Sequence, residues 1–160
     1  MDAENGRTIE MIPALILSCL IVAVPDGDTV HARCDGDAKP QKVRITRMDA
    51  PERKHLELGI AQQPYGDEAQ KALLRLCYGK TATVAVMGHD MYRRTLAAVS
   101  CDGVDVADRM IRDGLAWAYR PAKRSPLRAV EAEARAAGLG LWADPQPVAP
   151  WVWRKAGRAK

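Results

Sequence analysis

The 160-residue chain contains no phenylalanine, and aromatic residues make up only 5% of it. A platform that binds single strands by stacking bases on successive aromatic rings is therefore not expected. No apolar run approaches the roughly 20 residues that span a bilayer, so we expect no membrane partner. Internal repeats and interdomain linkers are also missing, and a chain of this length with 48% hydrophobic residues fits one folded domain.

The four cysteines lack the C-x-x-C spacing of structural zinc sites, which argues against bound zinc. If Asp26-Gly27 is a two-residue hairpin turn, Cys19 and Cys34 lie opposite each other on paired strands. A cross-strand disulfide is then geometrically plausible, and it would imply an oxidising compartment. Two buried thiols are the alternative, and nothing local decides whether Cys77 and Cys101 pair.

Positive charge is concentrated in the last quarter of the chain. From Ala118 to Lys160, nine lysines and arginines accompany three acidic residues, whereas the rest of the chain has 15 basic and 17 acidic residues. A basic flank raises the local concentration of polyanions such as nucleic acid and speeds their encounter. A solvated helix surface with a basic tail would give the same pattern, so charge alone does not decide between the two.

The chain divides into three segments. Residues 1–10 are polar and are expected to be disordered, residues 11–143 to form the domain, and residues 144–160 to be a proline-rich basic tail. Met11–Val24 has the length of a signal-peptide core, but mainly acidic charges precede it and no convincing small-residue cleavage site follows it. We interpret this stretch mainly as a buried strand, and the compartment, including export, stays open.

Hydrophobic periodicity predicts five strands, with a helix after the third and two helices at the end. The strands cover about residues 17–24, 29–34, 41–47, 81–87 and 94–100. The helices begin near Asp67, Val106 and Pro126 and end before Gly79, Gly114 and Gly138. This order is typical of an α+β fold that is mainly β, namely a five-stranded OB-type barrel with three α-helices.

Three carboxylates fall at the ends of predicted strands, where they are poor core material. Asp28 follows the predicted hairpin turn, while Asp49 and Glu52 follow the third strand, with Pro51 stiffening the segment between them. Ordinary turn chemistry explains each of them when it is taken alone. Together, their oxygens are the ligands that Ca²⁺ or Mg²⁺ prefers in proteins.

Two arginines on separate strands complete this pattern. Arg44 lies on the polar face of the third predicted strand, and Arg94 begins the fifth. Each alone is typical of a solvated strand. A carboxylate cluster with two separated guanidinium groups suits a phosphate diester and a hard cation, because arginine presents a planar and permanently charged fork to phosphate oxygens.

Six segments, in the same order along the chain, resemble the motifs of the staphylococcal nuclease (thermonuclease) family. The resemblance covers roughly Ser18 to Trp142. Each motif alone is weak to moderate, whereas the ordered set is strong. The segments are Val24–Val30, Arg44–Glu52, Tyr65–Ala69, Asp90–Arg94, Gly114–Pro121 and Gly138–Trp142.

The resemblance implies a metal site at the strand ends. Asp28 and Asp49 would ligate Ca²⁺, with Mg²⁺ or another divalent cation possible, and the backbone carbonyl of Ala50 would be a further ligand. Asp26 would not ligate the metal but would orient the metal site. Glu52 would act through a water molecule, as general base or as the residue that positions the water.

The resemblance also implies how a substrate is held. Arg44 and Arg94 would clamp the scissile phosphate, and together with Glu52 they form the implied catalytic set. Tyr92, Trp117 and Tyr119 would line the region where the base and the terminal phosphate lie. One departure stands beside Arg94: the family usually has glycine where this chain has Arg93, so either the turn differs or Arg93 adopts a strained backbone.

The function implied by the resemblance is hydrolysis of phosphodiester bonds in DNA and RNA. We expect a metal-dependent nuclease of low sequence specificity that acts on single strands, leaves 3′-phosphate ends and is a monomer. A non-catalytic OB-fold module that binds nucleic acid is the alternative. The presence of all five acidic and arginine positions favours catalysis, while a purely structural barrel would require six ordered matches to be accidental.

Overall fold

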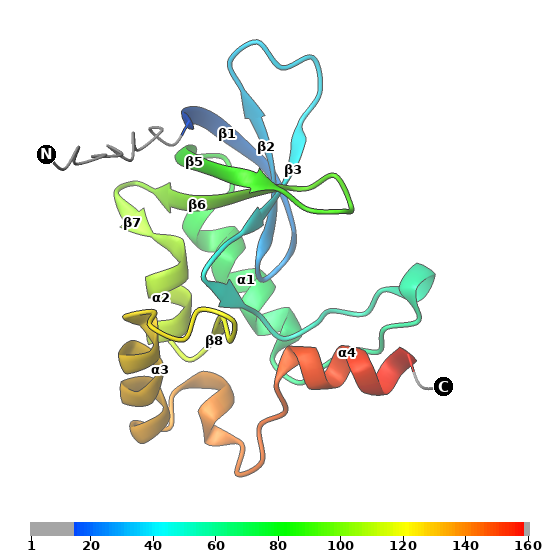
Figure 1. Cartoon of the computed structure of the whole chain (residues 1–160), viewed down its shortest axis with the longest axis vertical. Coiled ribbons are helices and arrows are strands. Elements are labelled where there is room, and N and C mark those ends of the chain that lie inside the picture. Colours follow the sequence, from blue (N-terminus) through cyan, green and yellow to red (C-terminus); the bar gives the residue numbers. More distant parts are fainter. Residues whose placement is uncertain (1–14, 159–160) are drawn as a thin grey trace, which may run out of the picture.

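The computed structural model describes residues 15–158, and it confirms the expected five-stranded OB-type barrel (Figure 1). The barrel strands are β1 (Leu15–Asp26), β2 (Thr29–Cys34), β3 (Gln41–Ile45), β5 (Thr81–His89) and β6 (Thr95–Cys101). They run in the order β3-β2-β1-β5-β6, with the short β7 (Val104–Asp105) beyond β6. Parallel pairing of β3 with β6, through Val43 and Thr95, closes the barrel. The residues 1–10 that we expected to be disordered lie outside the described part.

The barrel interior follows the alternation that the sequence predicts. Val43 and Ile45 are buried on β3, and Ala97 and Val99 are buried on β6. Successive side chains of a strand point to opposite faces, so one face of each strand joins the core while the other remains free. On β3 this places Arg44, between the two buried residues, outside the barrel core.

The three predicted helices are present as α1 (Gly66–Cys77), α2 (Val106–Arg112) and α3 (Leu127–Ala136). Helix α1 packs on β1, whereas α2 packs on β6 and on α3. Asp105 caps α2, because its side chain accepts a hydrogen bond from the backbone N–H of Asp108. Short 3-10 turns, η1 (Leu56–Leu58) and η2 (Gly140–Ala143), lie in the loops. None of the helices in residues 15–158 is long and apolar enough to cross a bilayer.

The predicted basic tail contains a fourth helix, α4 (Pro150–Arg158), which the sequence did not predict. Pro150 is the first residue of this helix, where a missing backbone N–H costs no intrahelical hydrogen bond. Trp151 of α4 packs edge-on against Trp117, with ring centroids 5.4 Å apart. This contact joins a second apolar cluster around Trp117 and Trp142, so the tail is part of the folded domain rather than an appendage.

The first hairpin confirms the cysteine register and corrects the turn. Gly27 and Asp28 form the turn and Asp26 pairs with Thr29, one residue later than we predicted, yet Cys19 still lies opposite Cys34. Two one-residue register shifts along β1 absorb the difference. Disulfide bonds join Cys19 to Cys34 and Cys77 to Cys101.

We predict that the unfolded protein, prepared without reductant, contains no titratable thiol. Reduction should also lower the free energy of unfolding, because each disulfide reduces the conformational entropy of the unfolded chain. For Cys77–Cys101, which closes a loop with a sequence separation of 24, the loss should be about 3 kcal/mol. Urea unfolding of the Cys77→Ala, Cys101→Ala double variant measures it. Four free thiols in the unreduced protein would contradict both bonds.

We predict that Gly66→Ala destabilises the fold, because an added Cβ would lie 2.3 Å from the carbonyl oxygen of Glu52. Overpacking of this kind costs about 1–3 kcal/mol. Gly157→Ala is the matched control, since a Cβ at that position of α4 has no neighbour closer than 3.8 Å. Urea unfolding should show the loss for the first variant only. Equal stability of Gly66→Ala and the parent chain would contradict the close contact.

Candidate active site

Asp28 and Asp49 come together where the first hairpin meets the segment after β3. Asp28 lies in the hairpin turn, and Asp49 ends the short strand β4 (Met48–Asp49), which pairs with β8 (Trp117–Ala118). The backbone N–H of Ala50 donates to Asp28 Oδ2 at 3.0 Å, which ties the two segments together. Gly27 allows this approach, because a Cβ there would lie 2.9 Å from the Ala50 side chain.

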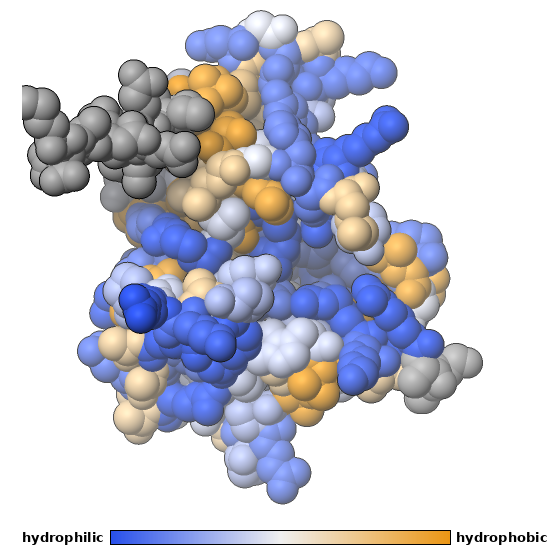
Figure 2. Space-filling model, viewed as in Figure 1, coloured by the Kyte–Doolittle hydropathy of each residue, from blue (hydrophilic) through white to orange (hydrophobic). Residues whose placement is uncertain are grey.

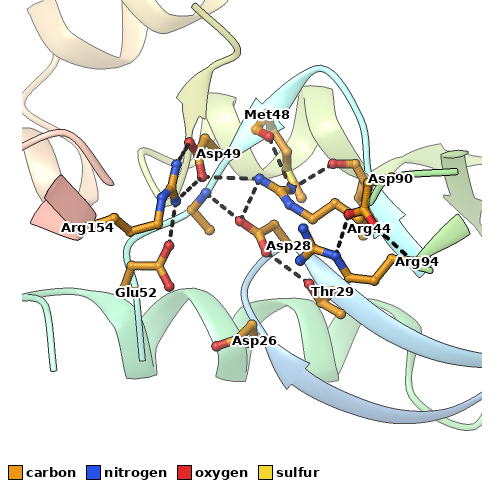
Figure 3. A network of polar contacts seen from close by, with 12 residues as sticks. Asp26, Asp28, Thr29, Arg44, Met48, Asp49, Glu52, Asp90, Arg94 and Arg154 are labelled. Carbon is orange, nitrogen blue, oxygen red and sulfur yellow. Dashed lines mark hydrogen bonds and ion pairs between the residues drawn. The ribbon is translucent and has the colours of Figure 1, made fainter. Parts of the chain in front are cut away.

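Arg44 connects the two aspartates, as Figure 3 shows. Its Nη2 lies 3.2 Å from Asp28 Oδ2 and 3.1 Å from Asp49 Oδ1. Its Nη1 donates to the carbonyl oxygens of Ile45 and Met48 at 2.9 and 3.3 Å. Two carboxylates therefore hold Nη2 of this guanidinium, and two backbone carbonyls hold Nη1.

Glu52 is held beside this pair by Gln63, which the sequence analysis did not single out. The Glu52 backbone N–H donates to Gln63 Oε1, and the Gln63 backbone N–H donates to the Glu52 carbonyl, both at 2.9 Å. Gln63 is 2% exposed, and its Nε2 also donates to the carbonyl of Val148, ahead of α4. No motif indicates this role, and the Val148 partner lies 85 residues away in the sequence.

Arg154 of α4 is the second residue that the sequence did not reveal. Its Nη2 and Nη1 donate to Asp49 Oδ2 and Oδ1 at 2.8 and 3.1 Å, and its Nη1 also donates to Glu52 Oε1 at 2.5 Å. Figure 3 shows its guanidinium reaching from α4 to the two carboxylates. Only the basic character of the tail hinted at such a contact, and no spacing placed this arginine at the site.

Arg94 immediately precedes β6, the strand that pairs with the Arg44 strand, but it contacts a different carboxylate. Its Nε donates to Asp90 Oδ2 at 2.7 Å, and its backbone N–H donates to Asp90 Oδ1 at 3.0 Å. The structure thus brings Arg94 to the neighbouring strand without joining it to Asp28 or Asp49. The preceding Arg93 has a φ of 62°, so the strained backbone foreseen for that position is present.

The three aromatic residues expected near the substrate differ in exposure. Tyr92 is 67% exposed and Tyr119 is 44% exposed, and the Arg94 guanidinium lies 5.7 Å from the Tyr92 ring centroid. Trp117 is only 5% exposed and packs against Trp142 and Trp151. This packing leaves almost none of the Trp117 ring for a substrate, so we narrow the expected contacts to the two tyrosines.

Asp26 pairs with a histidine that we had not linked to the site. His55 Nε2 lies 3.0 Å from Asp26 Oδ2. Burial and the nearby charge of Asp28 raise the pKa of Asp26, and His55 opposes that shift. Asp26 is therefore close enough for the charge of Asp28 to raise its pKa. Its expected role in orienting the site stays a prediction.

The electrostatics of the site favour a proton-accepting Glu52. Burial raises the pKa of Glu52, the hydrogen bond from Arg154 opposes this, and the charges of Asp28 and Asp49 add to the rise. Burial works against the charge of Arg154, but its contacts with Asp49 and Glu52 raise the pKa of this guanidinium. At Asp90, burial is outweighed by the hydrogen bonds from Arg94, and the pKa of Asp90 falls.

The oxygen donors fit a hard divalent cation that is only partly coordinated by the protein. Asp28 and Asp49 converge on one nitrogen of Arg44, which places oxygens from two segments around a common point. Mg²⁺ commonly uses one or two carboxylates, with water and phosphate oxygens completing its shell, and Ca²⁺ takes the same ligand types. Within residues 15–158 no group of three or more acidic, histidine or cysteine side chains surrounds a metal position. The Ala50 carbonyl stays a predicted ligand.

Comparison with known proteins matches residues 42–144 to the family model described as staphylococcal nuclease homologue. An uncharacterised endonuclease from Haemophilus influenzae is 37% identical over 139 residues, which is 86% of this chain and 73% of that protein. An uncharacterised endonuclease from Escherichia coli O157:H7 is 38% identical over 84% of this chain and 82% of its own. The staphylococcal-like nuclease CAN1 of Arabidopsis thaliana is 39% identical over 76% of this chain but only 35% of its own.

The matched segment contains Arg44, Asp49, Glu52 and Arg94 but neither Asp28 nor Arg154. Asp28 enters the site through the hairpin that precedes the segment, and Arg154 enters through the helix that follows it. The barrel, the clustered carboxylates and the two bacterial relatives agree with the resemblance seen in the sequence. The chain belongs to the staphylococcal nuclease homologue family.

Proposed function

We propose that the protein is a divalent-cation-dependent nuclease that hydrolyses phosphodiester bonds of DNA and RNA. The observation that carries this proposal is the convergence of Asp28 and Asp49 on Arg44, with Glu52 beside them. Family membership and relatives that are named nucleases or endonucleases support the same activity. Ca²⁺ is the preferred candidate, and Mg²⁺ or another divalent cation is the alternative.

The chain's own residues would divide the work as follows. Asp28 and Asp49 would hold the cation, and a bound cation would offset negative charge on the phosphate diester in the five-coordinate transition state. Arg44 donates to a phosphate oxygen in place of one of its present carboxylate partners. Arg94 approaches from the neighbouring strand when the phosphate competes with Asp90. Because both guanidinium groups stay charged at any working pH, they stabilise the transition state without a proton transfer.

Glu52 would supply the proton transfer. Its carboxylate accepts a proton from a water molecule whose oxygen bonds to phosphorus, while the bond from phosphorus to the 5′-oxygen breaks. The leaving oxygen takes up a proton and the phosphate remains on the 3′ end. An upward-shifted pKa suits this role, because a base with a pKa nearer the working pH accepts a proton more readily.

The proposed substrate is a single strand bound through its backbone. Arg44 and Arg94 would contact phosphate groups rather than base edges, so we propose low sequence specificity. Exposed Tyr92 and Tyr119 are candidates for stacking on a base or for contacting the terminal phosphate. Figure 2 shows hydrophilic side chains over much of α4, interrupted by white and orange patches, and a mixed surface over the barrel. That the active form is a monomer stays a prediction.

The direct test is cleavage of a labelled single-stranded oligonucleotide with Ca²⁺, with Mg²⁺ and with chelator. We expect cleavage only with a divalent cation. Glu52→Gln and Arg44→Ala should each lower kcat by about 100-fold or more, because general-base and charge-stabilising groups contribute at least that much. Product ends should carry a 3′-phosphate.

Glu133→Gln and Arg75→Ala are the matched controls. Each removes the same charge from an exposed helix position away from the site, and each should cleave at nearly the parent rate. If the parent chain binds the strand yet never cuts it with any cation, the alternative of a non-catalytic binding module holds instead. If Glu52→Gln retains full activity, the base lies elsewhere.

A further inference from the structure

The C-terminal helix α4 places a guanidinium on the two carboxylates that the proposed reaction needs free. Arg154 makes a two-pronged contact with Asp49 and a third contact with Glu52. Asp49 is the proposed cation ligand and Glu52 the proposed base. These contacts use both oxygens of Asp49 and one oxygen of Glu52, so a cation bound on Asp49 would lie directly beside the Arg154 guanidinium.

The helix is held in this place by several contacts that do not involve Arg154. Trp153 Nε1 donates to the carbonyl of Ala61 at 3.0 Å, and Trp151 packs on Trp117. Ahead of the helix, the Val148 carbonyl accepts a hydrogen bond from Gln63, the same side chain that holds the Glu52 backbone. These contacts fix the position of α4, and the position of α4 in turn places Arg154 beside Asp49 and Glu52.

The charges give a reason for the contact. Asp28, Asp49 and Glu52 carry three negative charges, and Arg44 offsets only one of them. Like charges in a partly buried site repel, so a second guanidinium stabilises the carboxylates as long as no cation is present. Once a divalent cation lies on Asp28 and Asp49, the same guanidinium would repel it at close range.

We propose that Arg154 is an internal counter-ion that competes with the cation: it neutralises Asp49 and Glu52 and has to leave them before a divalent cation binds there. This inference rests on the proposed cation-dependent function. Its consequence is a lowered apparent affinity for the cation, because only the fraction of molecules with Arg154 displaced is competent to bind. A long, flexible side chain on a fixed helix can make this exchange without moving the barrel.

The test is calorimetric titration of Ca²⁺ into the full chain and into Arg154→Met, which keeps an unbranched stem and removes the charge. We expect the dissociation constant to fall by about tenfold or more, as it would if the displaced form is a minor population in the parent chain. Arg154→Lys should give an intermediate value, because lysine keeps the charge but lacks the fork. Thermal unfolding of both variants checks that they fold.

Lys155→Met is the matched control, because it removes the same charge from the adjacent, exposed position of α4. Its Ca²⁺ affinity should stay within about twofold of the parent, which separates the contact from a general effect of charge. Cleavage by Arg154→Met at saturating Ca²⁺ should keep at least about a third of the parent kcat, since a displaced counter-ion takes no part in the chemistry.

Three results would overturn the proposal. Unchanged or weaker Ca²⁺ binding by Arg154→Met would do so while leaving the nuclease proposal intact. A collapse of kcat at saturating Ca²⁺ would mean that Arg154 acts on the substrate itself. If Ca²⁺ and Mg²⁺ bind neither the parent chain nor any Arg154 variant, the cation site of the proposed function fails as well, so the two failures are distinguishable.

Discussion

Mutual repulsion among three clustered carboxylates is the constraint on which the rest of the site depends. Asp28, Asp49 and Glu52 lie close together in a partly buried place, where the attraction or repulsion between charges is stronger than in water. Two guanidinium groups, from Arg44 and Arg154, offset most of that charge in the structure. A site of this kind is costly to form, and clustered carboxylates in a partly buried place are typical of functional sites.

The scaffold holds these groups from several directions. The hairpin turn presents Asp28, the β4–β8 pairing fixes Asp49, and Gln63 holds the backbone of Glu52. Disulfide bonds close the first hairpin and tie α1 to β6. The carboxylates thus lie where strands end and loops begin, on a closed barrel that has little freedom to deform. Precise geometry on a rigid support is what a site built on charge stabilisation needs.

Local signals predicted most of the fold. Hydrophobic periodicity and the glycines that end the helices depend only on neighbouring residues, and the structure confirms the five strands and three helices that they predicted. The hairpin turn was misplaced by one residue because bulges in β1 are not visible in a hydrophobic pattern. Helix α4 was missed because Trp151 and Trp153 find their partners, Trp117 and the Ala61 carbonyl, far away in the sequence.

Some residues of the candidate site were predicted from motif spacing, and others were not. Motif spacing predicted that Asp28, Arg44, Asp49 and Glu52 belong together, and the structure joins them by direct contacts or through Arg154. The contacts of Arg154, and that of Gln63 with Val148, escaped prediction because they cross more than 80 residues of sequence. The Gln63–Glu52 pair spans only 11 residues but belongs to no motif. Trp117 was expected at the substrate but is buried by Trp142 and Trp151, since the cluster that covers it forms only in three dimensions.

The most direct measurement is a crystal structure of Glu52→Gln with Ca²⁺ and a short single-stranded oligonucleotide. The account predicts that the ion lies against the carboxylates of Asp28 and Asp49, and that one backbone phosphate contacts the ion, Arg44 and Arg94. An ion bound away from both aspartates, or a strand that follows another surface with its phosphates far from Arg44, would contradict the central claim that this carboxylate cluster is a phosphodiesterase site.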